Sequence, residues 1–553
     1  MTARLAIILY AAILSLSVAT MARAAELKIG MSQFPTSFNP HFDAAVAKSY
    51  AIQMTQRPIT AYDQDWKLIC LLCTEVPTLE NGQAKLETLA DGSQGIAVTY
   101  RLQPAATWGD GTPVTSADMV FTWEAGRHPK SGFGNFEIFR RILAIDVIDD
   151  KTFTLHVDRV DYQYSAAPYD ILPAHLERPI FEADPTAYRN RSTYETDPTN
   201  PGLAFGPYRI AEVVAGSRIV LVPNPTWWGA PPAFEPITVL SIENTAALEA
   251  NLLSGAIDMI AGELGLTIDQ ALAFEKRHGD RYNIIYKPGL IYEHVDLNSD
   301  NPILADKRVR RALIHGLDRE ALNGTLFGGK QPVAQTSVSP LDWVYDPDVP
   351  NYDFDPERAK ALLEEAGWTP GSGGVRQNAN GERLTLELMT TAGNRSRELV
   401  AQVLQSQWRD LGIDARIRNE PARVFFGETV GKRKFTGGAM FAWVSSPENI
   451  PRTTLYSDQI PTADNNWAGQ NYTGFANAEM DAVIDAIEIE LDRDKRKTLW
   501  SRLQRLYAEE LPVIPLYWRA NSFILPKWLK GVRPTGHLNS TTLWVEDWYA
   551  EGR

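Results

Sequence analysis

The sequence has few of the residues that build metal and redox centres. Its 553 residues include two cysteines and eight histidines, and no two histidines stand three to five positions apart. Metal sites on one helix face use such a spacing. The hydrolase patterns H-E-x-x-H and G-x-S-x-G are also missing. We therefore expect no metal, no cofactor and no catalytic residues, and predict that the protein is not an enzyme.

The two cysteines, Cys70 and Cys73, form a C-x-x-C pair. Outside the cytosol such a pair is either a disulfide or a redox centre. A thioredoxin-type centre begins a helix, whereas this pair is followed by Thr-Glu-Val-Pro-Thr, which is typical of a loop or an edge strand. We favour a local structural disulfide over a redox function.

Positive charge is in the minority, with 54 Lys and Arg against 68 Asp and Glu and a net charge of −14. This balance argues against a nucleic-acid partner, because phosphate binding relies on basic surface.

Long apolar runs are also scarce, and the exception lies at the N-terminus. Arg4 precedes an apolar run from Leu5 to Ala19, and Ala22-Arg23-Ala24 follows as a cleavage pattern. The run is shorter than the roughly 20 residues that span a bilayer. We predict a signal peptide over residues 1–24, cleaved near Ala24, and a periplasmic mature protein.

The stretch from Tyr100 to Glu124 joins a strand, a glycine turn and a helix. An alternating pattern ends at Leu102, and Gly109-Asp110-Gly111 predicts a tight turn. Thr115 and Asp118 form the pattern of a capped helix start. The stretch offers no nucleophile or metal ligand, so we interpret it as structural.

Further along, helical and strand patterns alternate, which indicates an α/β protein. Capping residues predict helices after Asp306, Asp318 and Asp355, and a glycine stop at Gly255 ends another. A buried strand is predicted late in the chain, at Ile514. Strands are also predicted over residues 27–31, 152–157, 257–260 and 384–389, a hairpin around Gly216, and helices over residues 246–253, 397–408 and 480–491.

Four blocks in order resemble the family 5 extracellular solute-binding proteins of ABC importers, which include oligopeptide-, dipeptide- and nickel-binding proteins. The blocks are Asp110-Gly-Thr-Pro-Val-Thr-Ser-Ala-Asp118, Gly206-Pro-Tyr-Arg with Trp227-Trp228, residues 298–322, and Asp355-Pro-Glu-Arg through Gly367-Trp368.

The resemblance implies an α/β, periplasmic-binding-protein-like fold with two hinged lobes and an extra domain inserted in the first. Lobe I would comprise residues 25–56, 204–296 and 510–553, the inserted domain residues 57–203, and lobe II residues 297–509. It further implies capture of a peptide or peptide-like solute by a monomer, and delivery to an ABC permease and ATPase at the inner membrane.

Peptide-binding members of the family place an Asp shortly after a Trp in the second lobe, where it pairs with the peptide's ammonium. Here Trp443 is present, but Ser445 and Ser446 stand where the Asp is expected. Either Glu448 takes the charge, or a free amine is not anchored in this way. The predicted ligand-binding residues are Trp443, Ser445, Ser446, Glu448, Asn466, Trp467 and Asn39.

Several alternatives remain open at this point. The same class of protein carries opines, oligosaccharides, haem or metal chelates; nickel is disfavoured because no histidine pair is evident. An exported hydrolase would show turnover that one Ser, Asp or Glu substitution abolishes. A chaperone or sensor with this fold would bind unfolded chains or a membrane receptor.

Overall fold

The computed structural model describes residues 25–42, 45–133, 137–421, 424–464 and 469–552. Within them, ten strands form one mixed sheet that runs through the molecule. The predicted signal peptide, residues 1–24, lies outside the described residues. The strands in spatial order are β14 (Asp414–Glu420), β13 (Thr385–Thr391), β15 (Gly438–Val444), β12 (Tyr282–Leu297), β16 (Val513–Pro526), β11 (Met259–Ile260), β1 (Ala25–Met31), β10 (Phe234–Ser241), β9 (Arg218–Pro223) and β8 (Tyr208–Val214).

The remaining strands form smaller sheets. A four-stranded antiparallel sheet has the order β4 (Ala84–Thr88), β5 (Gln94–Arg101), β7 (Thr152–Val157) and β6 (Ile142–Asp149). Two short pairs are β2 (Thr60–Tyr62) with β3 (Leu68–Cys70), and β17 (Leu529–Lys530) with β18 (Tyr549–Ala550).

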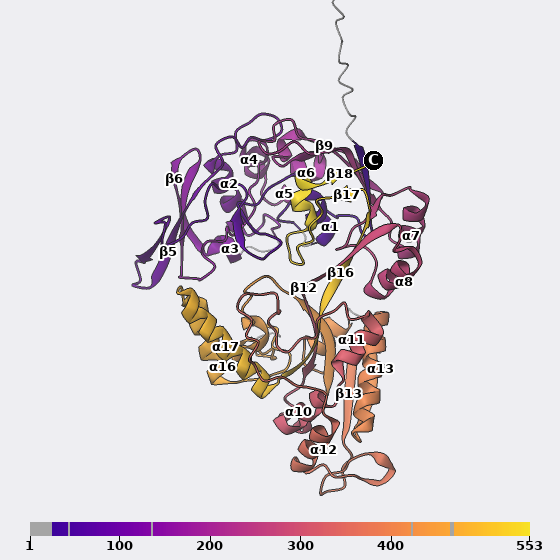
Figure 1. Cartoon of the computed structure of the whole chain (residues 1–553). Helices are drawn as coiled ribbons and strands as arrows, with labels where there is room; N and C mark the ends of the chain where they lie inside the picture. The colour runs from indigo at the N-terminus through magenta and orange to yellow at the C-terminus, as the bar shows by residue number, and fades with distance from the viewer. Residues whose placement is uncertain (1–24, 43–44, 134–136, 422–423, 465–468, 553) are drawn as a thin grey trace, which may run out of the picture.

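Two long strands join two bodies (Figure 1). β12 and β16 pair antiparallel at the middle of the large sheet and pass between the bodies. The upper body carries α1 (Val46–Ile52), α2 (Ser116–Arg127), α3 (Glu137–Arg140), α4 (Ala174–Ala183), α5 (Tyr188–Arg191), α6 (Thr193–Thr196), α7 (Thr245–Ser254) and α8 (Ile268–His278). The lower body carries α10 (Lys307–His315), α11 (Arg319–Phe327), α12 (Pro356–Glu365), α13 (Arg395–Asp410), α16 (Ala478–Ile489) and α17 (Arg493–Glu510). Two one-turn helices are α9 (Pro302–Ala305) and α15 (Arg452–Leu455).

Local sequence patterns located most of these elements correctly. Thr115 and Asp118 make the predicted reciprocal capping box of α2, and Gly111 takes the left-handed conformation at φ 91°. Gly255 ends α7 in the same conformation. Asp306, Asp318 and Asp355 each cap a helix through a side-chain oxygen. The run from Met480 to Ile487 lies in α16, which ends at Ile489, so the predicted helix over residues 480–491 extends too far. The next apolar run belongs to the separate helix α17.

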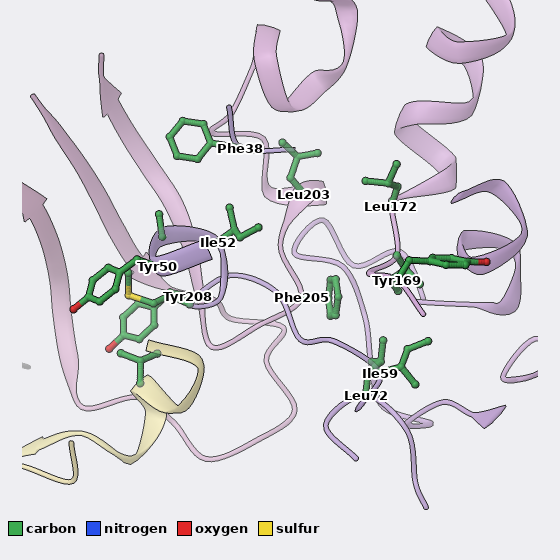
Figure 2. Close-up of a cluster of buried hydrophobic side chains, with 14 of the residues drawn as sticks. Phe38, Tyr50, Ile52, Ile59, Leu72, Tyr169, Leu172, Leu203, Phe205 and Tyr208 are labelled. Atoms are coloured by element: carbon green, nitrogen blue, oxygen red, sulfur yellow. The ribbon is translucent and has the colours of Figure 1, made fainter. Parts of the chain in front are cut away.

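One continuous hydrophobic core lies inside the upper body. Figure 2 shows Tyr50, Phe205 and Tyr208 gathered with Ile59 and Tyr169, although Ile59 and Tyr169 fall in the predicted inserted segment, residues 57–203. All five side chains are buried. The inserted segment therefore shares a core with the strands that flank it. The four-stranded sheet of this segment lies between residues 84 and 157, well inside the predicted boundaries at residues 57 and 203.

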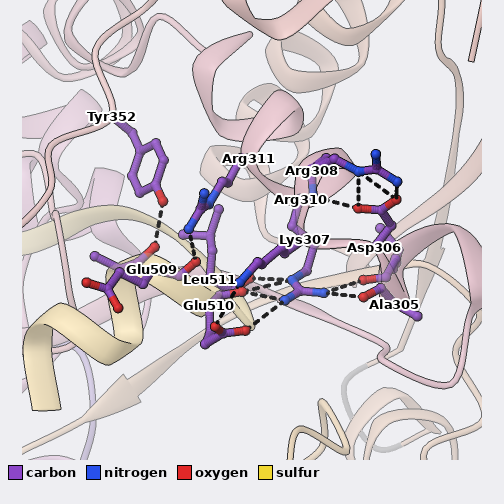
Figure 3. Close-up of polar contacts among 12 residues, drawn as sticks. Ala305, Asp306, Lys307, Arg308, Arg310, Arg311, Tyr352, Glu509, Glu510 and Leu511 are labelled. Atoms are coloured by element: carbon purple, nitrogen blue, oxygen red, sulfur yellow. Dashed lines mark hydrogen bonds and ion pairs between the residues drawn. The ribbon is translucent and has the colours of Figure 1, made fainter. Parts of the chain in front are cut away.

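A second hydrophobic core lies inside the lower body. At its edge, two arginines of α10 bind the carboxyl end of α17. The guanidinium of Arg310 donates to the backbone oxygens of Glu510 and Leu511, at 3.0 and 3.1 Å from Nε, and Arg311 donates to the oxygen of Glu509 at 2.6 Å (Figure 3). These carbonyls end α17, where the helix leaves acceptors unpaired and the dipole favours positive charge. The two arginines thus set the point where the chain turns into β16.

Two further findings concern the pair of cysteines and the membrane. The structure joins Cys70 to Cys73 by a disulfide, at the end of β3. Among the described residues, no helix is long and apolar enough to cross a bilayer.

Candidate functional site

The two crossing strands lose their regular pairing halfway along. Pro288 faces Ala520 and Tyr292 faces Trp518, so three residues of β12 stand opposite one of β16. Such a bulge bends the strand and leaves backbone groups for other partners. The N–H of Leu290 accordingly donates to the oxygen of Gly536 at 2.9 Å.

Gly289 is required at this break. A Cβ at position 289 would stand 2.7 Å from the oxygen of Gly536, too close for any side chain. The backbone of residues 536–540 therefore approaches the bulge closely.

A cavity of about 540 Å³ opens at the bulge. Its walls come from both bodies and from the crossing strands, and its volume is typical of small-ligand sites. The upper body contributes Val46, Lys48, Ser49, Glu263, His537, Leu538 and Ser540, the crossing strands Gly289, Leu290, Ile291, Arg519 and Asn521, and the lower body Val444 and Ser445.

The cavity contains charged groups of both signs. Glu263 accepts from Thr541 N and Oγ1 through Oε1, at 2.8 and 2.7 Å, while its buried Oε2 has no partner among the described residues. Burial raises the pKa of the Glu263 carboxyl. Arg519 is held by Glu293, which accepts from its Nε at 2.7 Å. Burial lowers the pKa of His537 to about 4, so this ring is neutral at pH 7.

A second cavity, of about 200 Å³, borders the first on the side of the lower body. The two share Val444 and Ser445, at the end of β15. Its lining includes Tyr292, His294, Asp296, Ser337, Trp443, Tyr507 and Trp518. We call it the side cavity, and the larger one the main cavity.

The predicted ligand-binding residues are distributed unevenly around these cavities. Trp443 lines the side cavity, and Ser445 lines both. Ser446 and Glu448 line neither cavity. Asn466 and Trp467 lie outside the described residues.

Asn39 lines neither cavity, although Pro40 and Lys48 next to it line the main one, and it is buried among polar neighbours. Its Oδ1 accepts from the N–H of His41 at 2.9 Å, and its amide donates to Ser192 Oγ at 3.4 Å. Its side chain is therefore used within the upper body.

Glu448 connects the lower body to the upper one. Its carboxylate lies 3.7 Å from Arg496, its N–H donates to Asp342 Oδ2 at 2.7 Å, and its carbonyl accepts from the hydroxyl of Tyr162. Tyr162 belongs to the segment 57–203, and its N–H also donates to the oxygen of Glu488 at 3.1 Å. We call these contacts the Tyr162 bridge.

The Tyr162 bridge holds Glu448 in a costly conformation. Its φ of 56° lies in the left-handed region, which costs a non-glycine residue of the order of 1–3 kcal/mol. The contacts to Asp342 and Tyr162 compensate for that strain. Glu448 is thus engaged between the bodies in this structure.

The cavities also contain charged residues that the sequence did not single out. Glu263, Asp296 and Arg519 occupy strands or the loops after them, where no local motif marks a ligand contact. Tyr292, His294 and Asp296 alternate along one strand, and this spacing predicts that their side chains lie on the same face of the sheet. Only the pairing of β12 with β15 and β16 shows that this face lines a cavity.

The geometry also bears on hydrolysis, because Ser337, His294 and Asp296 line the same cavity. In a serine hydrolase, one ring nitrogen faces the serine and the other the carboxylate. Here His294 Nδ1 contacts the oxygen of Tyr292 at 3.1 Å, and Nε2 faces Asp296 at 3.3 Å. Neither nitrogen faces Ser337, so this arrangement lacks the base that a serine nucleophile needs.

The family of the chain follows from comparison with known proteins. The model described as bacterial extracellular solute-binding proteins, family 5 Middle, matches residues 88–461. The chain therefore belongs to the family 5 bacterial extracellular solute-binding proteins. The predicted family and its class, a solute-binding protein, are confirmed.

Individual relatives extend over most of the chain. Oligopeptide-binding protein AppA of Bacillus subtilis (strain 168) is 23% identical over 518 residues, which cover 92% of this chain and 89% of that protein. The oligopeptide-binding protein of Thermus thermophilus, solved with a pentapeptide, is 30% identical with a TM-score of 0.71, covering 95% of this chain and 96% of that one.

A third similar protein is NikZ of Campylobacter jejuni, solved with Ni(L-His). It is 20% identical with a TM-score of 0.71, covering 95% of this chain and 99% of that one, and shows likeness of fold. These structures confirm the predicted fold class. The relatives are named as binding proteins, which agrees with the prediction of a non-enzyme.

Proposed function

We propose that the protein is the periplasmic receptor of an ABC importer, and that it captures a peptide or peptide-like solute between its two lobes. The observation that carries this proposal is the main cavity, because both bodies and the crossing strands contribute its walls. A site divided in this way closes when the lobes rotate about the strands that join them. The pentapeptide complex of the Thermus relative supports a peptide ligand.

The proposed hinge is the bulge opposite Arg519. Strand pairing is regular from Tyr282 to Pro288, is interrupted between Pro288 and Tyr292, and shifts once more between Glu293 and His294. Bending there moves Val444 and Ser445 toward or away from the upper body. The Tyr162 bridge joins the bodies at a second place, near the end of α16, and stabilises the closed arrangement.

The closed monomer would then deliver the solute to a permease and ATPase at the inner membrane. Peptide backbones are held in such clefts by main-chain hydrogen bonds as well as by side chains. The polar and charged groups around the main cavity suit the two ends of a peptide.

Native mass spectrometry of the mature protein, purified without denaturation, tests this function. We expect an added mass that fragments as a peptide, and a thermal shift when the stripped protein meets a pool of peptides. A mass that carries a metal ion would instead indicate a chelate. If the protein retains no ligand and no peptide pool raises its melting temperature, the proposal is wrong.

Two variants test the site. Trp443→Ala removes a wall of the side cavity, and we expect peptide affinity to fall by about tenfold or more, as for truncation of a buried aromatic anchor. Glu448→Gln removes the charge that faces Arg496 but keeps the backbone contacts of the Tyr162 bridge, so it should lower affinity less. Trp227→Ala is the matched control, because this half-buried tryptophan lines neither cavity. Unchanged affinity in the first two variants would contradict the assignment of the site.

A further inference from the structure

We propose that the side cavity is a subsite for a cationic group of the ligand, an ammonium or guanidinium that binds the carboxylate of Asp296. The inference rests on the proposed function, because the group has to enter from a ligand in the main cavity. It names an acid on β12 in place of the one expected beside Trp443.

The carboxylate of Asp296 is buried without a full set of partners. The residue is 4% exposed and lines the side cavity. Within the described part of the chain, its recorded polar contact is His294 Nε2, at 3.3 Å. An ionised carboxylate removed from water needs a counter-charge and hydrogen-bond donors. The free face of this carboxylate is therefore available to a ligand.

The ring of His294 gives a second reason to expect a hydrogen-bond donor beside Asp296. Its Nδ1 lies 3.1 Å from the oxygen of Tyr292, and a carbonyl only accepts, so Nδ1 carries the hydrogen. Nε2 faces an oxygen of Asp296, and it is an acceptor whenever the ring carries no second hydrogen. Two acceptors this close repel each other unless a proton or a donor group stands beside them. The N–H groups of a cation satisfy both.

Other orphaned polar atoms surround the same space. Ser337 Oγ and Trp518 Nε1 are buried and have no hydrogen-bond partner among the described residues. Trp518 is 1% exposed. Buried polar groups are nearly always paired in folded proteins, so this concentration around one cavity indicates a missing ligand group.

The walls suit the stem of a long cationic side chain. Tyr292, Trp443, Tyr507 and Trp518 present rings to the side cavity, and the ring of Tyr292 lies 5.0 Å from that of Trp518. Aromatic faces attract ammonium and guanidinium groups and pack against their methylene stems. The mouth is at Val444 and Ser445, whereas Asp296 faces Ala439 further along β15. A side chain that reaches Asp296 from a ligand in the main cavity therefore needs a long apolar stem, whereas an N-terminal ammonium reaches it only if the peptide backbone itself enters the side cavity.

Two sources supply this chemistry, the Lys or Arg side chain of a peptide and its N-terminal ammonium. A library of pentapeptides in which one position is Lys, Arg, norleucine or Glu, each with a free and an acetylated N-terminus, separates them. Competition against a labelled peptide from the same library gives relative affinities. We expect Lys and Arg peptides to bind at least about tenfold tighter than their norleucine counterparts, the size of one charged hydrogen bond in a buried site.

Asp296→Asn identifies the acid. Asparagine has the same shape, so norleucine peptides should bind the variant as they bind the native protein, which also shows that it is folded. The preference for Lys and Arg should fall to about twofold or less. If acetylation, rather than loss of Lys or Arg, removes the Asp296-dependent preference, the subsite holds the N-terminal ammonium.

The failures of the two proposals are distinguishable. If no pentapeptide binds the native protein, the proposed function is wrong and the subsite falls with it. If pentapeptides bind but neither cationic group improves affinity, or if the preference survives in Asp296→Asn, the subsite is wrong and peptide binding stands.

Discussion

Glu293 lies at the centre of the crossing strands, and its replacement by glutamine tests how the hinge is held. The side chain is fully buried and accepts from Arg397 Nε at 2.6 Å and from Arg519 Nε at 2.7 Å. Arg397 lies on α13 and Arg519 on β16, so one carboxylate joins a helix of the lower body to both crossing strands. Glutamine keeps the shape but removes the negative charge between two guanidinium groups.

The structure sets the expected magnitude. Removing one partner of a buried ion pair costs about 3–5 kcal/mol, because the remaining charge stays buried and unpaired. The Arg519 side chain is 31% exposed, which screens its part of the interaction and favours the lower end of that range. A loss of about 3 kcal/mol lowers the melting temperature by about 6–12 °C for a unit of 150–250 residues.

Urea unfolding followed by circular dichroism, with thermal scans in the same buffer, measures this loss. Glu387→Gln is the matched control, because its pair with Arg418 lies at the surface and should contribute less than about 1 kcal/mol. Equal losses in Glu293→Gln and Glu387→Gln would refute the reasoning, since burial would then have no effect on the strength of the pair.

Two further predictions concern pH and the disulfide. Burial raises the pKa of the Asp342 carboxyl to about 6, so the folded protein holds that proton more tightly than the unfolded chain. Stability should therefore fall as pH rises from about 4 to 6, by at most about 3 kcal/mol, and Asp342→Asn should flatten this part of a pH series of urea midpoints; an unchanged slope would contradict the assignment. Breaking the bond between Cys70 and Cys73 with dithiothreitol should cost about 2 kcal/mol, because the loop it closes is short. Catalysis of insulin reduction by the pair would instead indicate a redox function.

Local chemistry explains which parts of the fold the sequence predicted. The helix ends were predicted from Thr115 with Asp118, Gly255 and Asp355. Each acts within one turn of its own helix, so a few neighbouring residues of sequence are enough to predict its effect. The late strand at Ile514 was predicted from its apolar run, and it forms the start of β16. The order of strands in the large sheet depends on pairings between distant segments, which no short window contains.

The site was harder to predict because distant segments build it. Trp443 was found through the family pattern, but Asp296, Glu263 and Arg519 come from three separate segments with no motif. Their roles depend on strand register, and a shift of one residue would turn Asp296 away from the cavity. The core shared by the segment 57–203 and its flanking strands was similarly hidden, because Ile59 and Phe205 belong to one core although they are far apart in sequence.

The order of strands in the large sheet also has a consequence for how the polypeptide acquires its structure. β1 pairs with β10 and β11, whereas β11 pairs with β16 at Ile524, so the large sheet is completed only after residues near position 524 exist. The ion pair of Arg57 with Glu546 likewise joins an early segment of the chain to its C-terminal end. Closing such long loops is slow. We therefore expect the two halves of the large sheet to be joined late, when nearly the whole polypeptide has been made.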